Sequence, residues 1–254
     1  MMHLLQLCLG LGAPAAAAEP IYYDNVVIVL DASGSMTQTF KGSSKSRWSA
    51  ATEALEIVVS QLPATTHLGL LVFSAQGGAS DWAHPLGPKD EPLLQRAFST
   101  LRPHGGTPLG EYIKVGADRL LQARDEQHGY GTYTLLVVTD GRAGDPKLVD
   151  AYSSDLLSRG LSLDVIGVAM EEDHTLKQVA HSYRRADNPD TLIRAVQDVF
   201  AEVSIGGDDQ VGADAFDVTD GLPDLFAMVL IEELAASRNH PIGTAPPLPP
   251  SAET

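Results

Sequence analysis

The chain has 254 residues, of which 44% are hydrophobic and 20% are charged. That is enough apolar material for one sizeable core, but the length is too short for two comfortable ones. The formal net charge of -16 disfavours nucleic acid and anionic lipid as partners, because like charges repel. After the first residues, no run approaches the roughly 20 apolar residues that cross a bilayer. We therefore expect no membrane span and no nucleic-acid partner.

Residues 1–18 have the pattern of a secretory signal peptide. The stretch from Leu4 to Leu11 is apolar with one Gln, and Ala16 and Ala18 form an A-x-A cleavage pattern. The usual positive flank is missing, so a buried N-terminal helix or a misplaced start codon is the alternative reading. We expect cleavage after Ala18 and a periplasmic or secreted protein. Because Cys8 is the single cysteine, the mature chain would form no disulfide.

Apolar strands alternate with amphipathic helices between residues 22 and 203. The β-branched run at 25–30 is typical of a strand buried on both faces. In chain order we expect strands at 25–30, 67–74, 82–86, 132–139 and 161–170, and helices at 46–62, 91–101, 109–123, 146–158, 175–182 and 191–203. Such alternation indicates parallel βαβ units. The sequence predicts one α/β domain at 22–203, a doubly wound, mostly parallel open sheet with helices on both faces.

The composition changes after residue 203. Residues 204–221 are acidic and Gly-rich, which is typical of a linker. Residues 222–237 predict one amphipathic helix, which either docks a partner or packs back on the parent domain. Residues 238–254 are Pro-rich, and we expect them to be disordered.

Oxygen-bearing side chains follow the buried strands at three places. The strand at 25–30 ends in Asp31-Ala32-Ser33-Gly34-Ser35, and the strand at 132–139 is followed by Asp140-Gly141. A third loop, before the helix at 109–123, reads Gly105-Gly106-Thr107-Pro108. In open α/β sheets, ligands bind at the carboxyl ends of the strands. We therefore expect two carboxylates and three hydroxyls at one edge of the sheet.

This set of side chains suits a hard cation. Mg²⁺ prefers oxygen ligands in octahedral geometry, and no imidazole or thiolate is needed. Two carboxylates would balance the charge of a divalent ion, while three neutral hydroxyls would leave it electrophilic. An open position on the ion would then attract an acidic group from a partner.

Each of these residues also has a plain structural role available to it. Ser33 and Ser35 could be turn formers, Thr107 could cap the helix that follows Pro108, and Asp140 could be a turn residue before a glycine. Turn chemistry does not require all of them at one edge of a sheet. The set taken together favours a metal site.

The segments 29–36, 105–109 and 138–141 resemble the von Willebrand factor type A domain and its metal-ion-dependent adhesion site (MIDAS). The resemblance covers about residues 22–203. It implies a site for Mg²⁺, or for Mn²⁺ or Ca²⁺, made of Asp31, Ser33, Ser35, Thr107 and Asp140. It further implies that the three hydroxyls bind the ion directly in the partner-bound form, that the carboxylates act directly or through water, and that a protein partner supplies a Glu or Asp carboxylate.

We expect a metal-dependent binding module and no enzyme. One alternative is a subunit of an ATPase, as in chelatase-like relatives, which would need a cytoplasmic location. A weaker alternative is a magnesium-dependent hydrolase. The chain has no phosphate-binding glycine loop with Lys and no G-x-S-x-G nucleophile elbow, and no residue presents itself as the general base. We assign no role to His67 and His84, and expect Trp48 to be a core or lid aromatic.

Overall fold

The computed structural model describes residues 23–170, 174–206 and 239–245. The expected signal peptide at 1–18 and the expected helix at 222–237 therefore lie outside the described residues, as does most of the expected linker. The last helix extends to Gly206, so the first residues of that linker, 204–206, are helical.

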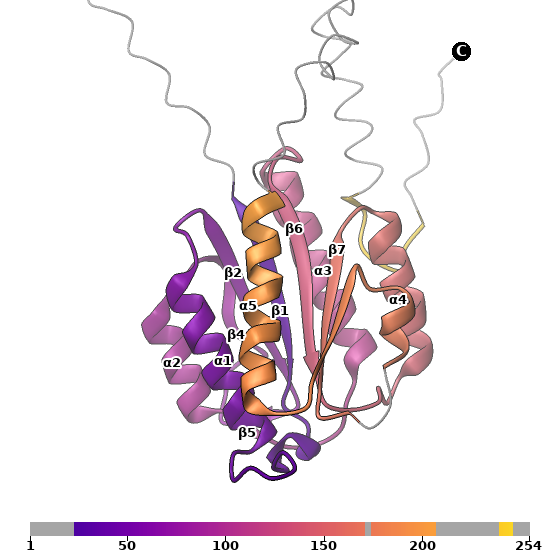
Figure 1. Ribbon diagram of the computed structural model, residues 1–254. Coiled ribbons are helices and arrows are strands. Elements are labelled where there is room, and N and C mark those ends of the chain that lie inside the picture. Colours follow the sequence, from indigo (N-terminus) through magenta and orange to yellow (C-terminus); the bar gives the residue numbers. More distant parts are fainter. Residues whose placement is uncertain (1–22, 171–173, 207–238, 246–254) are drawn as a thin grey trace, which may run out of the picture.

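A six-stranded sheet forms the centre of the described chain (Figure 1). Its strands are β1 (Asp24–Asp31), β2 (Thr66–Phe73), β4 (Trp82–Pro88), β6 (Thr132–Thr139), β7 (Ser162–Val168) and β8 (Ser182–Ala186). Their order is β4-β2-β1-β6-β7-β8, and all neighbours are parallel except β4, which runs antiparallel to β2. The predicted doubly wound, mostly parallel sheet is confirmed.

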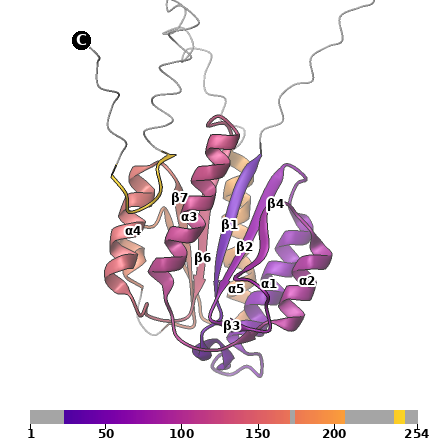
Figure 2. The same cartoon turned by 180° about the vertical axis from the view of Figure 1, so that it is seen from behind.

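Helices cover both faces of this sheet, as the two opposite views in Figures 1 and 2 show. One face carries α1 (Arg47–Gln61), α2 (Glu91–Thr100) and α5 (Pro189–Gly206). The other carries α3 (Leu109–Glu126) and α4 (Pro146–Ser158). Alternate side chains of β1 belong to different apolar cores. Ile28 and Leu30 lie in the core on the first face, and Val27 and Val29 lie in the core on the second. This double burial explains why the strand is an unbroken run of β-branched and aliphatic residues.

Local signals fix where several helices begin. The Ser46 hydroxyl accepts a hydrogen bond from Ser49 N at the start of α1, and Asp90 accepts one from Leu93 N at the start of α2. Pro146 occupies the first turn of α4, where its missing N–H is not needed. Trp48 is buried on α1 and belongs to the core.

Some elements differ from the sequence-based expectation. The helix expected at 175–182 is a short 3-10 helix, η2 (Thr175–Gln178), and it is followed by the unexpected strand β8. The sequence of β8 is SYRRA, which lacks the apolar run of the central strands because β8 lies at the edge of the sheet. Two further strands of two residues each, β3 (Ala75–Gln76) and β5 (Arg102–Pro103), pair with one another.

The expected disorder of the tail is wrong for residues 239–245. This segment packs against α3 and α4, and Ile242 is fully buried. Residues 246–254 lie outside the described residues. Among the helices that the structure describes, none is long and apolar enough to cross a membrane.

Candidate metal centre

The ends of β1 and β6 bring two carboxylates to the same edge of the sheet. The strands are parallel neighbours, with Leu30 beside Val138. Asp31 is the last residue of β1, and Asp140 directly follows β6. Parallel pairing therefore places residues from distant parts of the chain side by side, as the sequence predicted.

A chain of hydrogen bonds links four of the five predicted residues. Asp31 Oδ1 accepts from Ser33 N at 2.7 Å, and the Ser33 and Ser35 hydroxyls lie 3.0 Å apart. Ser35 Oγ donates to Asp140 Oδ1 at 2.7 Å. The other oxygen of Asp31 accepts from Thr139 Oγ1 at 2.7 Å. Ser35 lies in the 3-10 helix η1 (Gly34–Thr37), which folds its hydroxyl back toward β6.

The fifth residue, Thr107, is placed by its backbone. Gly34 N donates to Gly105 O at 3.1 Å, and Gly144 N donates to Thr107 O at 2.7 Å. The Thr107 loop is therefore tied both to the loop after β1 and to the loop after β6. The hydrogen bonds that link the other four residues do not include the Thr107 hydroxyl, so the structure brings its loop, rather than that hydroxyl, into contact with the rest.

Two residues outside the predicted ligand set, Ser74 and His104, hold this loop. Ser74, which follows β2, has a φ of 58° and donates from Oγ to Gly106 O at 2.6 Å. A positive φ is uncommon outside glycine, so Ser74 is held there by its surroundings. The backbone N–H of His104 donates to both Ala32 O and Ser74 O. His104 thus contributes its backbone to the site.

Asp145, the residue before α4, caps α3 from another part of the chain. Its carboxylate accepts from Gly110 N at 3.0 Å and from Glu111 N at 3.1 Å. A Cβ at Gly110 would lie 2.6 Å from Leu148 Cβ, so glycine is required where α3 crosses α4. The cap and the close crossing fix the start of α3, two residues beyond Thr107.

Arg47 is the functional candidate that the sequence analysis missed. This first residue of α1 donates from Nη1 to Asp140 Oδ2 at 2.8 Å, and the Asp140 side chain is 0% exposed. The Arg47 side chain is 15% exposed, and its Nε is buried without a hydrogen-bond partner among the described residues. Arg47 therefore neutralises Asp140 but is not itself fully satisfied. Its sequence signal is weak, because Arg47 and Asp140 are 93 positions apart.

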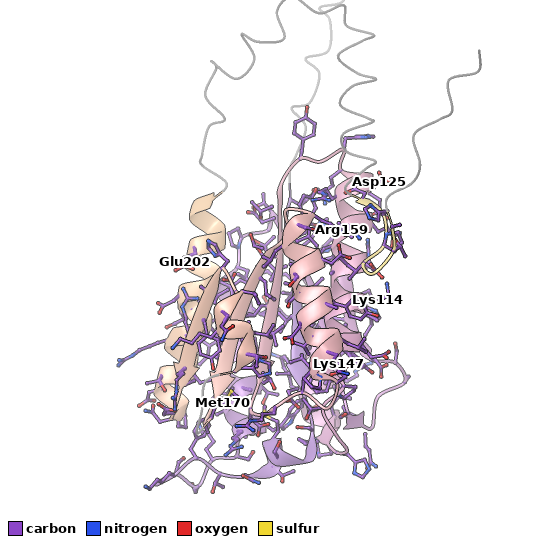
Figure 3. The ribbon with its side chains drawn as sticks, turned by 90° about the vertical axis from the view of Figure 1, so that its right-hand side faces the viewer. Lys114, Asp125, Lys147, Arg159, Met170 and Glu202 are labelled. Atoms are coloured by element: carbon purple, nitrogen blue, oxygen red, sulfur yellow. The ribbon has the colours of Figure 1, made fainter. Side chains whose placement is uncertain are left out.

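A pocket of about 410 Å³ opens beside Ser35 and Asp140. Its lining includes Ser35, Gln38, Arg47, Asp140, Arg142 and Met170. Met170, labelled at the lower end of Figure 3, marks this edge of the sheet. The edge therefore offers room for a group from outside the domain.

The charges around the site affect the pKa of Asp31. Burial raises the pKa of the Asp31 carboxyl above its ordinary value, and the negative charge of Asp140 adds to that effect. The hydrogen bonds from Ser33 and Thr139 act in the opposite direction without cancelling it. A buried carboxylate of this kind gains from a nearby cation.

The side chains at this edge fit a hard divalent cation. All of the candidate donors are carboxylate or hydroxyl oxygens, the ligand class that Mg²⁺ selects. Within the described ranges, no three His, Cys, Asp or Glu side chains form a group that could hold a metal. A metal at this edge would thus depend on hydroxyls as well as on the two carboxylates.

Comparison with known proteins identifies the family of this chain. The family model of the von Willebrand factor type A domain matches residues 25–202. The uncharacterised protein YwmC of Bacillus subtilis (strain 168) is 25% identical over 193 residues, which are 68% of this chain and 81% of YwmC.

Solved structures share the fold. The pilus adhesin SpaC from Lactobacillus rhamnosus GG superposes with a TM-score of 0.59 at 15% identity, over 73% of this chain and 31% of the adhesin. Proximal thread matrix protein 1 from the mussel byssus, in a form with a zinc-occupied MIDAS motif, gives a TM-score of 0.52 at 19% identity, over 71% of this chain and 45% of its own. The present chain therefore spans less than half of either neighbour.

Proposed function

The chain belongs to the von Willebrand factor type A domain family, and from that premise we propose that it is a metal-dependent protein-binding module rather than an enzyme. The proposed metal ligands are Asp31, Ser33, Ser35, Thr107 and Asp140. The proposed ion is Mg²⁺, with Mn²⁺ or Ca²⁺ as alternatives, and the proposed location is periplasmic or secreted. The observation that supports this most directly is the hydrogen-bonded chain from Asp31 through both serines to Asp140.

Each residue has a distinct task in this proposal. The carboxylates of Asp31 and Asp140 supply the negative charge, and the hydroxyls of Ser33, Ser35 and Thr107 supply neutral donors. Thr139 orients the buried Asp31 by its hydrogen bond at 2.7 Å. Held by these residues, an ion would supply a positive charge for a partner's Glu or Asp carboxylate. The neighbouring pocket, lined in part by Arg47 and Arg142, favours an acidic partner segment.

Isothermal titration calorimetry with Mg²⁺ and Mn²⁺ tests the metal site. We expect uptake by the wild type, and loss of uptake in Asp31→Ala and Thr107→Ala. At a metal concentration of about 100 times Kd, the wild type should gain about 2.7 kcal/mol of stability against unfolding. Asp198→Ala is the matched control, because Asp198 is exposed on α5, away from the site. Unchanged uptake in both site variants would refute the proposal.

Partner capture in magnesium and in chelator tests the binding role. Wild-type and Asp31→Ala proteins serve as baits, and the captured proteins are compared. We expect one set of partners to be lost both from the variant and in chelator. If every partner is still captured by Asp31→Ala and in chelator, the binding does not depend on a bound ion.

A further inference from the structure

Residues 239–245 lie across α3 and α4 at the end of the domain farthest from the candidate metal centre. The segment is yellow in Figure 1, and Figure 3 shows it beside Lys114, Asp125 and Arg159. In sequence it follows α5 only after residues 207–238. Its contacts are those of a short peptide in a groove, because the side chains of Asn239 and Ile242 and several backbone groups carry them.

The anchor of the segment is Ile242. Its side chain is 0% exposed and belongs to the apolar cluster on the α3 and α4 face. Its backbone N–H donates to Asp118 Oδ1 at 2.6 Å, and its carbonyl accepts from Lys114 Nζ at 2.6 Å. Lys114 and Asp118 are one turn apart on α3 and pair with each other at 2.7 Å. One ion pair therefore binds both backbone groups of the anchor residue.

A second ion pair, at the C-terminal end of α4, binds the residues that flank the anchor. Arg159 donates to the carbonyls of His240 and Thr244, and its side chain is only 3% exposed. Asp155 accepts from Gly243 N at 2.7 Å and pairs with Arg159 at 2.8 Å. The two pairs lie on neighbouring helices and point to the same short segment.

The groove also restricts the sequence that it accepts. Gly243 has a φ of 78°, which side-chain-bearing residues rarely adopt. A Cβ at this position would lie 2.9 Å from Cε1 of the Tyr152 ring. On the other side, Asn239 Oδ1 accepts from Arg124 Nε at 2.6 Å. An aliphatic residue followed by glycine is therefore required, with an amide upstream.

We propose that the groove between α3 and α4 is a peptide-recognition site, and that residues 239–245 are its resident, separable ligand. Each ion pair joins residues four apart, Lys114 and Asp118 on α3 and Asp155 and Arg159 at the C-terminal end of α4, so neither pair needs the segment to bring its two partners together. The groove is consequently preformed, and it binds the same sequence when that sequence is supplied as a separate peptide. This inference does not depend on the metal site.

The test uses the full chain with its own segment disabled. In Ile242→Asp, a carboxylate would have to enter the apolar hole, so the segment leaves and the groove is vacated. A fluorescently labelled, capped peptide of residues 239–245 is then titrated in a polarisation assay. We expect it to bind Ile242→Asp at least tenfold more tightly than the wild type, whose groove is occupied.

A second variant and a second peptide complete the design. Gly243→Val clashes with Tyr152 but keeps the anchor, and it should bind the peptide as Ile242→Asp does. A peptide that carries Asp in place of Ile242 should bind neither variant. Equal binding to wild type and variants, or no binding to either folded variant, would overturn the proposal.

Discussion

The two ends of the domain use the same kinds of residue with different charge balance. At the candidate metal centre, Arg47 pairs with Asp140, while Asp31 is held by hydrogen bonds from Ser33 N and Thr139 Oγ1. At the peptide groove, Asp118 and Asp155 each have a cation of their own. Burial raises the pKa of Asp31. Burial acts in the same direction on Asp155, but hydrogen bonds from Arg159 and from Gly243 N outweigh it and lower its pKa.

The two pKa directions separate the carboxylates of the two ends. A carboxylate whose pKa falls below the ordinary value is already satisfied by the protein. A carboxylate whose pKa is raised by burial, as that of Asp31 is, gains from a nearby cation. On this criterion Asp155 of the groove is satisfied within the protein, whereas Asp31 at the opposite edge is the carboxylate that a bound cation would stabilise.

The largest expected effect concerns the ion pairs of the groove between α3 and α4. Asp155→Ala removes the partner of Arg159, whose side chain is almost fully buried, and we expect a loss of about 3 kcal/mol in the free energy of unfolding. Urea denaturation measures this loss, with Asp198→Ala as a control within about 0.5 kcal/mol of wild type. Metal affinity should stay within about twofold. A large change in metal affinity would mean that the two ends are coupled.

The next largest effect concerns the charge balance of the candidate metal centre. Arg47→Gln removes the guanidinium that competes with a metal for Asp140, so Mg²⁺ affinity should rise about tenfold, or about 1.4 kcal/mol. Arg47→Lys keeps the charge and should stay close to wild type. Calorimetry on the three proteins measures the difference. Weaker binding in Arg47→Gln would show that Arg47 supports the ion instead of competing with it.

The smallest effect is the pH dependence, which should separate the two ends. The folded pKa of Asp31 lies above 3.8, so protons compete with the metal as the pH falls toward that raised value, by at most about tenfold per pH unit. The folded pKa of Asp155 lies below 3.8, so its contribution to stability is fully present above 3.8 and is lost only below it. Thermal unfolding with and without Mg²⁺ from pH 7 to pH 4 should show metal stabilisation shrinking first. Simultaneous loss of both contributions would contradict the comparison.

Much of the fold follows from local sequence. The β-branched run of β1 and the caps at Ser46 and Asp90 define their elements without tertiary information. The edge strand β8 was missed because its exposure removes the apolar pattern. Family motifs pointed to the five candidate ligands, and parallel strand ends explain why they meet.

The remaining features depend on contacts between distant positions. Arg47 meets Asp140 across 93 positions, and Asp145 caps Gly110 across 35. Ile242 lies in a Pro-rich stretch without helical or strand periodicity, and its burial comes from a groove made by α3 and α4. No window of local sequence contains both halves of any of these interactions.

The position of β1 in the sheet has a consequence for how this domain can diversify. β1 lies between β2 and β6, so the carboxyl ends of all three strands form one rigid platform, from which the chain continues toward α1, β3 and α4 respectively. Insertions in the connecting loops would lengthen outward into solvent and leave the platform unchanged. New recognition surfaces can thus arise around an unaltered set of oxygen donors, through changes in loop length alone.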